Sequence, residues 1–138
     1  MFLLDTNVVS ELRKVRSGKA DVNVAEWIRV VPAPILFISA IVIQELETGV
    51  LLAERRDPQK GAILRAWLEQ HVIPRFSERI LPIDVLVARR SAAMHVPDPR
   101  PVRDALIAAT ALVHRMTVVT RNIDAFLPMG VALLNPWD

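Results

Sequence analysis

The feature that most constrains this fold is a regular alternation of short apolar runs with longer segments in which apolar residues recur at helical spacing. The short runs lie at residues 2–4, 35–38, 79–82, 117–119 and 131–134, and the helical segments at 8–14, 24–31, 40–55, 57–71, 84–94 and 102–115. Ser39 and Asp84 stand directly before two of these helices, as N-cap residues do. Alternation of this kind is typical of a parallel sheet with helices on both faces.

The chain is expected to form one α/β domain. No internal repeat and no linker rich in Gly or Ser divides residues 1–138, and the short runs supply a central parallel sheet of four to five strands. The apolar start at residues 1–4 is too short for a signal peptide, and the longest apolar segment, 30–43, falls short of the roughly 20 residues that cross a bilayer. We therefore expect a soluble, cytoplasmic protein with no membrane partner.

Composition excludes several kinds of chemistry. The chain has no cysteine, which rules out a disulfide scaffold, a Cys-ligated metal and a thiol nucleophile. It has four glycines, and none of its lysines (Lys14, Lys19 and Lys60) follows a Gly-rich loop, so no phosphate-binding loop or dinucleotide fingerprint is present. Seventeen basic residues face fifteen acidic ones with no basic block, which leaves the surface without an evident nucleic-acid footprint.

Acidic residues follow the predicted strands, at the sheet edge where open α/β folds bind ligands. Asp5 comes directly after the first strand, with the hydroxyl of Thr6 and the amide of Asn7 beside it. A carboxylate with such neighbours suits a hard cation, and it equally suits a helix N-cap. In the helix after the second strand, neither Glu45 nor Glu47 has a cation three or four residues away, so no helix-surface ion pair explains either one.

Two more acids stand near later segments of the chain. Asp104 opens an apolar helix behind the proline-rich stretch 96–102, where it interacts favourably with the helix dipole or serves as a preorganised ligand. Asp124 follows the fourth strand together with Thr120 and Asn122, and residues of these types also close turns.

If these acids converge at one edge of the sheet, their charges need a counter-ion. Two carboxylates ~4 Å apart repel each other by roughly 4 kcal/mol at an effective dielectric constant of 20. A divalent cation removes this repulsion, and a ligand set made only of oxygen atoms favours Mg²⁺ or Mn²⁺ over zinc. Such a site is suited to phosphoryl chemistry.

Four segments together resemble the PIN domain, and most closely the VapC-type toxins of type II toxin–antitoxin systems. They are Leu3-Leu4-Asp5-Thr6-Asn7, Ser39 through Glu45-Leu46, Asp104-Ala105-Leu106-Ile107-Ala108-Ala109-Thr110-Ala111 and Thr120-Arg121-Asn122. The terminal Leu134-Asn135-Pro136-Trp137 also looks like that group, and the resemblance covers essentially the whole chain.

The resemblance implies a PIN-like fold and a metal-dependent endoribonuclease that is usually dimeric and is inhibited by a cognate antitoxin. By position, Asp5, Glu45 and Asp104 match the acidic Mg²⁺ or Mn²⁺ ligands, with Glu45 rather than Glu47 in register. Thr6, Thr120 and Asn122 match supporting polar positions.

The sequence departs from the family pattern at the fourth acid. Ala125 stands where the family commonly has an aspartate, and Asp124 is displaced by one residue, which is a rotation of about 100° in a helical turn. We expect Asp5, Glu45 and Asp104 to hold the metal and Asp124 to contribute weakly or through water.

Three arginines flank the expected site: Arg100, Arg103 and Arg121. They are candidates for holding RNA phosphates, although Arg103 has the alternative of pairing with a site carboxylate.

Two other protein classes are excluded by residues that this chain lacks. A haloacid-dehalogenase-type phosphatase needs a second aspartate where Asn7 stands and a late lysine that is absent, and a response-regulator receiver fails on the same lysine. The remaining alternative is a catalytically weakened PIN-like module that acts with a DNA-binding antitoxin as a repressor complex and meets DNA only through that partner.

Overall fold

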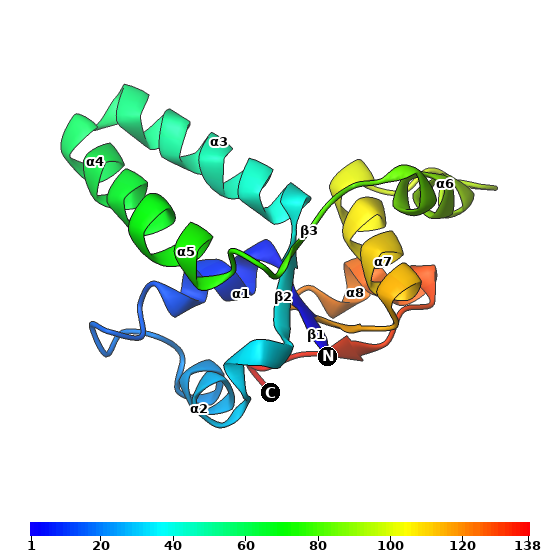
Figure 1. The fold of residues 1–138 in the computed structure, drawn as a ribbon, viewed down its shortest axis with the longest axis horizontal. Coiled ribbons are helices and arrows are strands. Elements are labelled where there is room, and N and C mark those ends of the chain that lie inside the picture. Colours follow the sequence, from blue (N-terminus) through cyan, green and yellow to red (C-terminus); the bar gives the residue numbers. More distant parts are fainter.

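Five short parallel strands form the centre of the molecule. The computed structural model describes residues 1–138 and contains a single parallel sheet of five strands, within the predicted four to five (Figure 1). The strand order is β3-β2-β1-β4-β5. The strands are β1 (Phe2–Leu4), β2 (Leu36–Ser39), β3 (Ile80–Leu81), β4 (Thr117–Val119) and β5 (Leu133–Leu134). Every neighbouring pair is parallel, with β1 paired to β2 and β4 on its two sides. Residues that follow β1, β2 and β4 therefore meet at one edge of the sheet.

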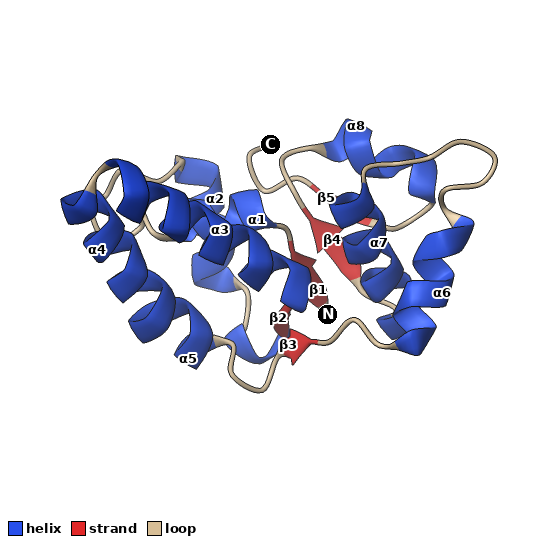
Figure 2. Cartoon of the chain, turned by 90° about the horizontal axis from the view of Figure 1, so that it is seen from above, coloured by secondary structure: helices blue, strands red, loops and turns tan.

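Eight α-helices connect and cover the strands. They are α1 (Thr6–Leu12), α2 (Val22–Val30), α3 (Ala40–Arg56), α4 (Pro58–Trp67), α5 (Ile73–Arg75), α6 (Val85–Ala93), α7 (Val102–His114) and α8 (Ile123–Phe126). A π-helical turn, η2 (Leu68–Val72), joins α4 to α5, and the 3₁₀ turns η1 (Ala33–Ile35) and η3 (Leu127–Met129) precede β2 and follow α8. Figure 2 shows the sheet between α1–α5 and α6–α8.

Side-chain caps set the starts of several helices. Ser39 accepts a hydrogen bond from Ile41 N at the start of α3, and Asp84 accepts one from Val87 N at the start of α6, which confirms both predicted N-caps. The first helix begins at Thr6, two residues earlier than predicted, because Asp5 is already its N-cap. The strand therefore passes into the helix with no loop between them, which fixes the direction of the Asp5 side chain.

The core is built around β1 and α7. Leu3 and Leu4 are fully buried in the central strand, and α7 contributes buried Ile107 and several buried alanines. The small alanine side chains let α7 lie close to the sheet. This packing places the first turn of α7, with Asp104, at the sheet edge beside Asp5. None of the helices combines the length and apolar character that a membrane-spanning helix needs.

The helices α3 and α4 form a hairpin that extends beyond the sheet (Figure 1). The two helices approach so closely at Gly61 that a Cβ added there would lie 2.4 Å from the Cα of Glu54. Arg65 of α4 lies within 4 Å of three glutamates, with Nη1 at 2.7 Å from Glu47, Nη2 at 3.0 Å from Glu54, and Nη1 at 3.5 Å from Glu69.

Candidate active site

The Asp5 carboxylate lies at the carboxyl end of the central strand and is almost fully buried, with 7% of the residue exposed. Its Oδ1 accepts a hydrogen bond from Thr6 N (2.8 Å). Its Oδ2 accepts one from the Thr120 hydroxyl (2.7 Å) and a longer one from the Asn7 amide (3.3 Å). All three donors are neutral, so they orient the carboxylate without cancelling its charge.

Glu45 reaches the same edge from the second turn of α3. Its Oε1 accepts a hydrogen bond from the Thr6 hydroxyl (2.9 Å). Thr6 therefore donates to two acids, to Asp5 through its backbone N–H and to Glu45 of α3 through its hydroxyl. Its Oε2 lies 3.9 Å from Nη1 of Arg103 on α7. This ion pair is weak, because the distance is long and the Arg103 side chain is half-exposed. The absence of a cation along α3 therefore did not exclude an ion pair, because the partner comes from another helix.

Asp104 completes the cluster from the first turn of α7. Burial is the main cause that raises the pKa of its carboxyl group, and the nearby charges of Asp5 and Glu45 raise it further. The structure thus brings together the three acids that the sequence singled out as metal ligands. Burial also raises the pKa of Asp5, against the hydrogen bonds from Thr120 and Thr6, which lower it.

The chemistry of these three acids suits a divalent cation, but their side chains do not form a complete coordination site. No group of three or more acidic or histidine side chains stands close enough to surround an ion as the side chains lie. The donor set is nevertheless made of carboxylate oxygens. Burial raises the pKa of Asp5 and of Asp104, and the charges of Asp5 and Glu45 raise that of Asp104 further. A bound cation would relieve the repulsion between these charges, and Mg²⁺ and Mn²⁺ prefer such oxygen ligands.

The fourth predicted acid is not drawn into this network. Asp124 lies in the first turn of α8, is exposed, and makes no hydrogen bond or ion pair. The neighbouring Ala125 is partly buried against the core. The role of Asp124 at a metal stays a prediction, since the charges that raise the pKa of Asp104 in addition to burial are those of Asp5 and Glu45.

The predicted supporting residues divide into two kinds. Thr6, Asn7 and Thr120 contact site carboxylates through their side chains. Asn122 contributes only its backbone N–H, which donates to the Thr120 hydroxyl oxygen (3.0 Å), while its side chain is exposed. Asn122 therefore lies next to the cluster, but its side chain does not contact the clustered acids.

Glu47 has a structural role that the sequence did not reveal. Its Oε2 pairs with Nη1 of Arg65 at 2.7 Å, across the α3–α4 hairpin. Local sequence alone did not decide which of Glu45 and Glu47 belongs to the acidic cluster. In the structure only Glu45 lies near Thr6 and the other acids.

The three flanking arginines differ in their surroundings. Arg103 lies near Glu45, as its alternative role predicted. Arg100 donates its backbone N–H to Nδ1 of His95 (3.0 Å), which closes the loop before α7. Arg121 donates its backbone N–H to the Asn7 side-chain oxygen (3.3 Å), and its guanidinium lies over the Trp137 ring.

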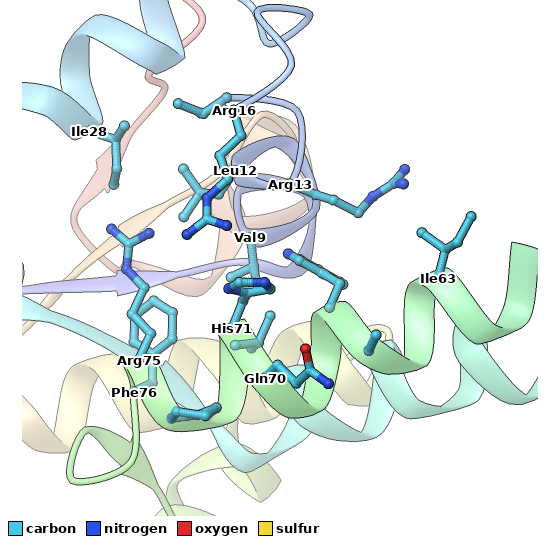
Figure 3. A pocket seen from close by; sticks show the side chains of 15 residues that line it. Val9, Leu12, Arg13, Arg16, Ile28, Ile63, Gln70, His71, Arg75 and Phe76 are labelled. Carbon is cyan, nitrogen blue, oxygen red and sulfur yellow. The ribbon is translucent and has the colours of Figure 1, made fainter.

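A large cavity lies away from these acids. It is a groove of about 900 Å³ between α1, α2, α4 and α5, with an apolar floor that includes Val9 and Phe76 (Figure 3). Arg13, Arg16 and Arg75 are exposed along it. Partial burial lowers the pKa of Arg75, and the charge of the neighbouring Arg79 lowers it further.

Comparison with known proteins agrees with the fold. A profile of the PIN domain matches residues 2–127. Toxin FitB of Neisseria gonorrhoeae is 37% identical over 142 residues, and VapC ribonuclease Y4jK of Sinorhizobium fredii is 34% identical over 143, each match covering at least 99% of both chains. The solved structure of FitAB bound to an IR36 DNA fragment aligns with a TM-score of 0.88 at 35% identity, over 100% of this chain and 96% of that one.

The chain therefore belongs to the PIN domain family, with the parallel α/β architecture that the sequence predicted. Its full-length relatives within that family include toxin FitB and a VapC ribonuclease, which confirms the group indicated by the sequence motifs.

Proposed function

We propose that this protein is the toxin of a toxin–antitoxin pair and that it hydrolyses RNA phosphodiester bonds in a reaction dependent on Mg²⁺ or Mn²⁺. The observation that carries the proposal is the cluster of Asp5, Glu45 and Asp104, in which the pKa values of Asp5 and Asp104 are raised by burial and, for Asp104, by the other two acids. Uncompensated carboxylates at the ligand-binding edge of the sheet are suited to a divalent cation and a phosphate.

The side chains of the site divide the work. Asp5, Glu45 and Asp104 would hold the cation, which when bound supplies positive charge for the phosphate and activates a water molecule. Thr120, Asn7 and Thr6 fix the orientation of Asp5 and Glu45, so little reorganisation is needed when substrate arrives. Arg103 lies beside Glu45, half-exposed, where its guanidinium is available to a substrate phosphate.

The direct test is cleavage of labelled RNA in Mg²⁺ or Mn²⁺. We expect cleavage that is abolished by a chelator, by Asp104→Asn and by Glu45→Gln. Glu47→Gln is the matched control, because Glu47 stands on the same helix but pairs with Arg65 outside the site. If the wild-type chain cleaves RNA neither in Mg²⁺ nor in Mn²⁺, the proposed nuclease activity is contradicted and the repressor module is favoured. That module is the second candidate because the related FitAB was solved bound to DNA.

The antitoxin partner is proposed on the basis of the relatives and the groove. The solved relatives include FitAB, bound to a DNA fragment. The groove offers an apolar floor with Arg13, Arg16 and Arg75 around it, none of which is in an ion pair. An amphipathic, acidic segment of the antitoxin complements both features. DNA would then be contacted through the antitoxin.

We also propose that the protein forms a homodimer. Leu51 and Leu52 of α3 expose 55% and 49% of their surface, and the α3–α4 hairpin projects beyond the sheet. An exposed pair of leucines on a projecting hairpin is a candidate for an interface. Light scattering of Leu51→Glu should show monomers where the wild-type chain forms dimers, and an unchanged mass would place the interface elsewhere.

A further inference from the structure

Arg121 and Trp137 form a pair beside the acidic cluster. The Arg121 guanidinium carbon lies 5.2 Å from the centre of the Trp137 ring. An arginine at this distance over an indole face is attracted by the electrons of the ring and adopts a restricted orientation. Neither of the other two flanking arginines lies over an aromatic ring.

Both members of the pair are anchored through their backbones. The Arg121 N–H donates to the Asn7 side-chain oxygen, and the same Asn7 side chain donates to Asp5. The Trp137 N–H donates to the Asn135 side chain (2.9 Å), while its carbonyl accepts from the Asn23 amide (2.8 Å). The Trp137 side chain also packs against the hydrophobic core, which restricts its movement. Through Asn7, the backbone of Arg121 is linked to the Asp5 carboxylate by two hydrogen bonds.

The charge of Arg121 is unused within the protein. Its side chain is exposed and makes no ion pair or hydrogen bond. Stacking occupies the flat face of a guanidinium and leaves the N–H groups at its edge free, which is the geometry that binds a phosphate with two parallel hydrogen bonds. Arg103, by comparison, already lies near Glu45.

We propose that Arg121 binds a phosphate of the RNA strand next to the bond that is cut, and that Trp137 is a positioning residue that holds its guanidinium. The inference rests on the proposed ribonuclease function and adds to it a subsite for the substrate backbone. A phosphate contact of this kind carries no base preference, so it would strengthen binding of any RNA sequence in the site.

The test is binding of a fluorescein-labelled single-stranded RNA of mixed sequence, measured by anisotropy across a series of salt concentrations. Asp104→Asn in Mg²⁺ serves as the uncleaving parent. We expect Arg121→Ala in this parent to weaken binding by roughly tenfold and to reduce the slope of log K against log salt by about 0.7, the value for one phosphate contact on a single strand. Arg121→Lys should lose affinity but keep the slope, because the charge stays and the stacked plane is lost.

Arg56→Ala is the matched control, since Arg56 is an exposed, unpaired arginine at the far end of α3. The role of Trp137 is tested by a double-mutant cycle. If Trp137 acts through Arg121, adding Trp137→Ala to Arg121→Ala should weaken binding no further, whereas Trp137→Ala alone should weaken it.

Three results would overturn the inference. An Arg121→Ala variant that behaves like Arg56→Ala, with wild-type cleavage intact, removes the subsite and leaves the proposed nuclease standing. Additive losses in the cycle remove the positioning role of Trp137. If the wild-type chain does not cleave RNA and the Asp104→Asn parent does not bind it, both the proposed function and this subsite are wrong.

Discussion

Asp5 is a buried carboxylate whose hydrogen-bond partners are all neutral: a backbone N–H, a hydroxyl and an amide. Hydrogen bonds from Thr120 and Thr6 lower its pKa, but desolvation is the larger cause and raises it. Two other acids stand close by, and the one cation that pairs with any of the three, Arg103, lies 3.9 Å from Glu45 and is half-exposed. At the scale of single residues, the site is therefore arranged for an ion that the chain itself does not provide.

Removing the charge of Asp5 should separate activity from stability. We expect Asp5→Asn to abolish RNA cleavage and to leave the metal-free protein as stable as the wild type or more stable. A raised pKa means that the folded state binds the Asp5 proton more tightly than the unfolded state. The cost of ionising Asp5 therefore appears as pH rises from the unfolded pKa near 3.8 through the raised folded pKa, and it persists above.

Thermal melts in a chelator at several pH values check this prediction. The difference in stability between Asp5→Asn and the wild type should grow in favour of the variant as pH rises through that range. A variant that is markedly less stable at neutral pH would identify Asp5 as a structural cap.

Asp124 and Asp104 make a second comparison between single residues. Asp124→Ala should reduce metal affinity far less than Asp104→Ala, because Asp124 is exposed and has no contact with the three clustered acids. Calorimetric titration with Mn²⁺ measures both. Equal losses would mean that α8 moves toward the metal when it binds.

The α3–α4 hairpin shows how much depends on packing between elements. Arg65 of α4 pairs with Glu47 and Glu54 of α3, and Gly61 permits the close approach of the two helices. Because α3 also carries Glu45, the hairpin anchors one wall of the site.

Two glycines in this hairpin give opposite predictions for the same substitution. Gly61→Ala should destabilise the fold by about 1–3 kcal/mol, since its Cβ would meet the backbone of Glu54 at 2.4 Å. Gly49→Ala on α3 should stabilise it by roughly 0.5–1 kcal/mol, because nothing lies within 4 Å of the added Cβ and alanine favours a helix. Chemical denaturation of both variants checks the pair, and similar effects of both would contradict the close approach.

The strands, most helices and the acids at the sheet edge could be predicted from the sequence, because they depend on local spacing and on the strand that precedes each residue. Asp5 follows β1 directly, and Ser39 and Asp84 are local caps. The partners of Glu47 and Arg121 could not be predicted in this way. Arg65 and Trp137 come from other segments, and only the folded packing brings them within reach.

The π-helical turn is a further feature beyond local reasoning. Residues 57–71 were expected to form one regular helix, but the chain widens at Leu68–Val72 before α5. Leu68 and Val72 are both fully or almost fully buried there, so tertiary packing accompanies the change of helical geometry.

At the scale of the whole molecule, the site joins three separate parts of the chain, so an ion bound there should stabilise the entire fold. We expect Mg²⁺ or Mn²⁺ to raise the free energy of unfolding by about 2.7 kcal/mol when the free ion is ~100-fold above its dissociation constant. Melts with and without the metal measure the shift, and Asp104→Asn should lose most of it. A shift of equal size in that variant would locate the stabilising ion elsewhere.

The order of the strands has a consequence for how this protein is made. The central strand β1 is synthesised well before its neighbour β4 and before the Thr120 hydroxyl that orients Asp5, which lies 115 residues further along the chain. A growing polypeptide therefore carries Asp5 and Glu45 without Asp104 or Thr120 until those later segments have been added. For a nuclease, this order of synthesis would delay assembly of the acidic cluster until β4 has packed against β1.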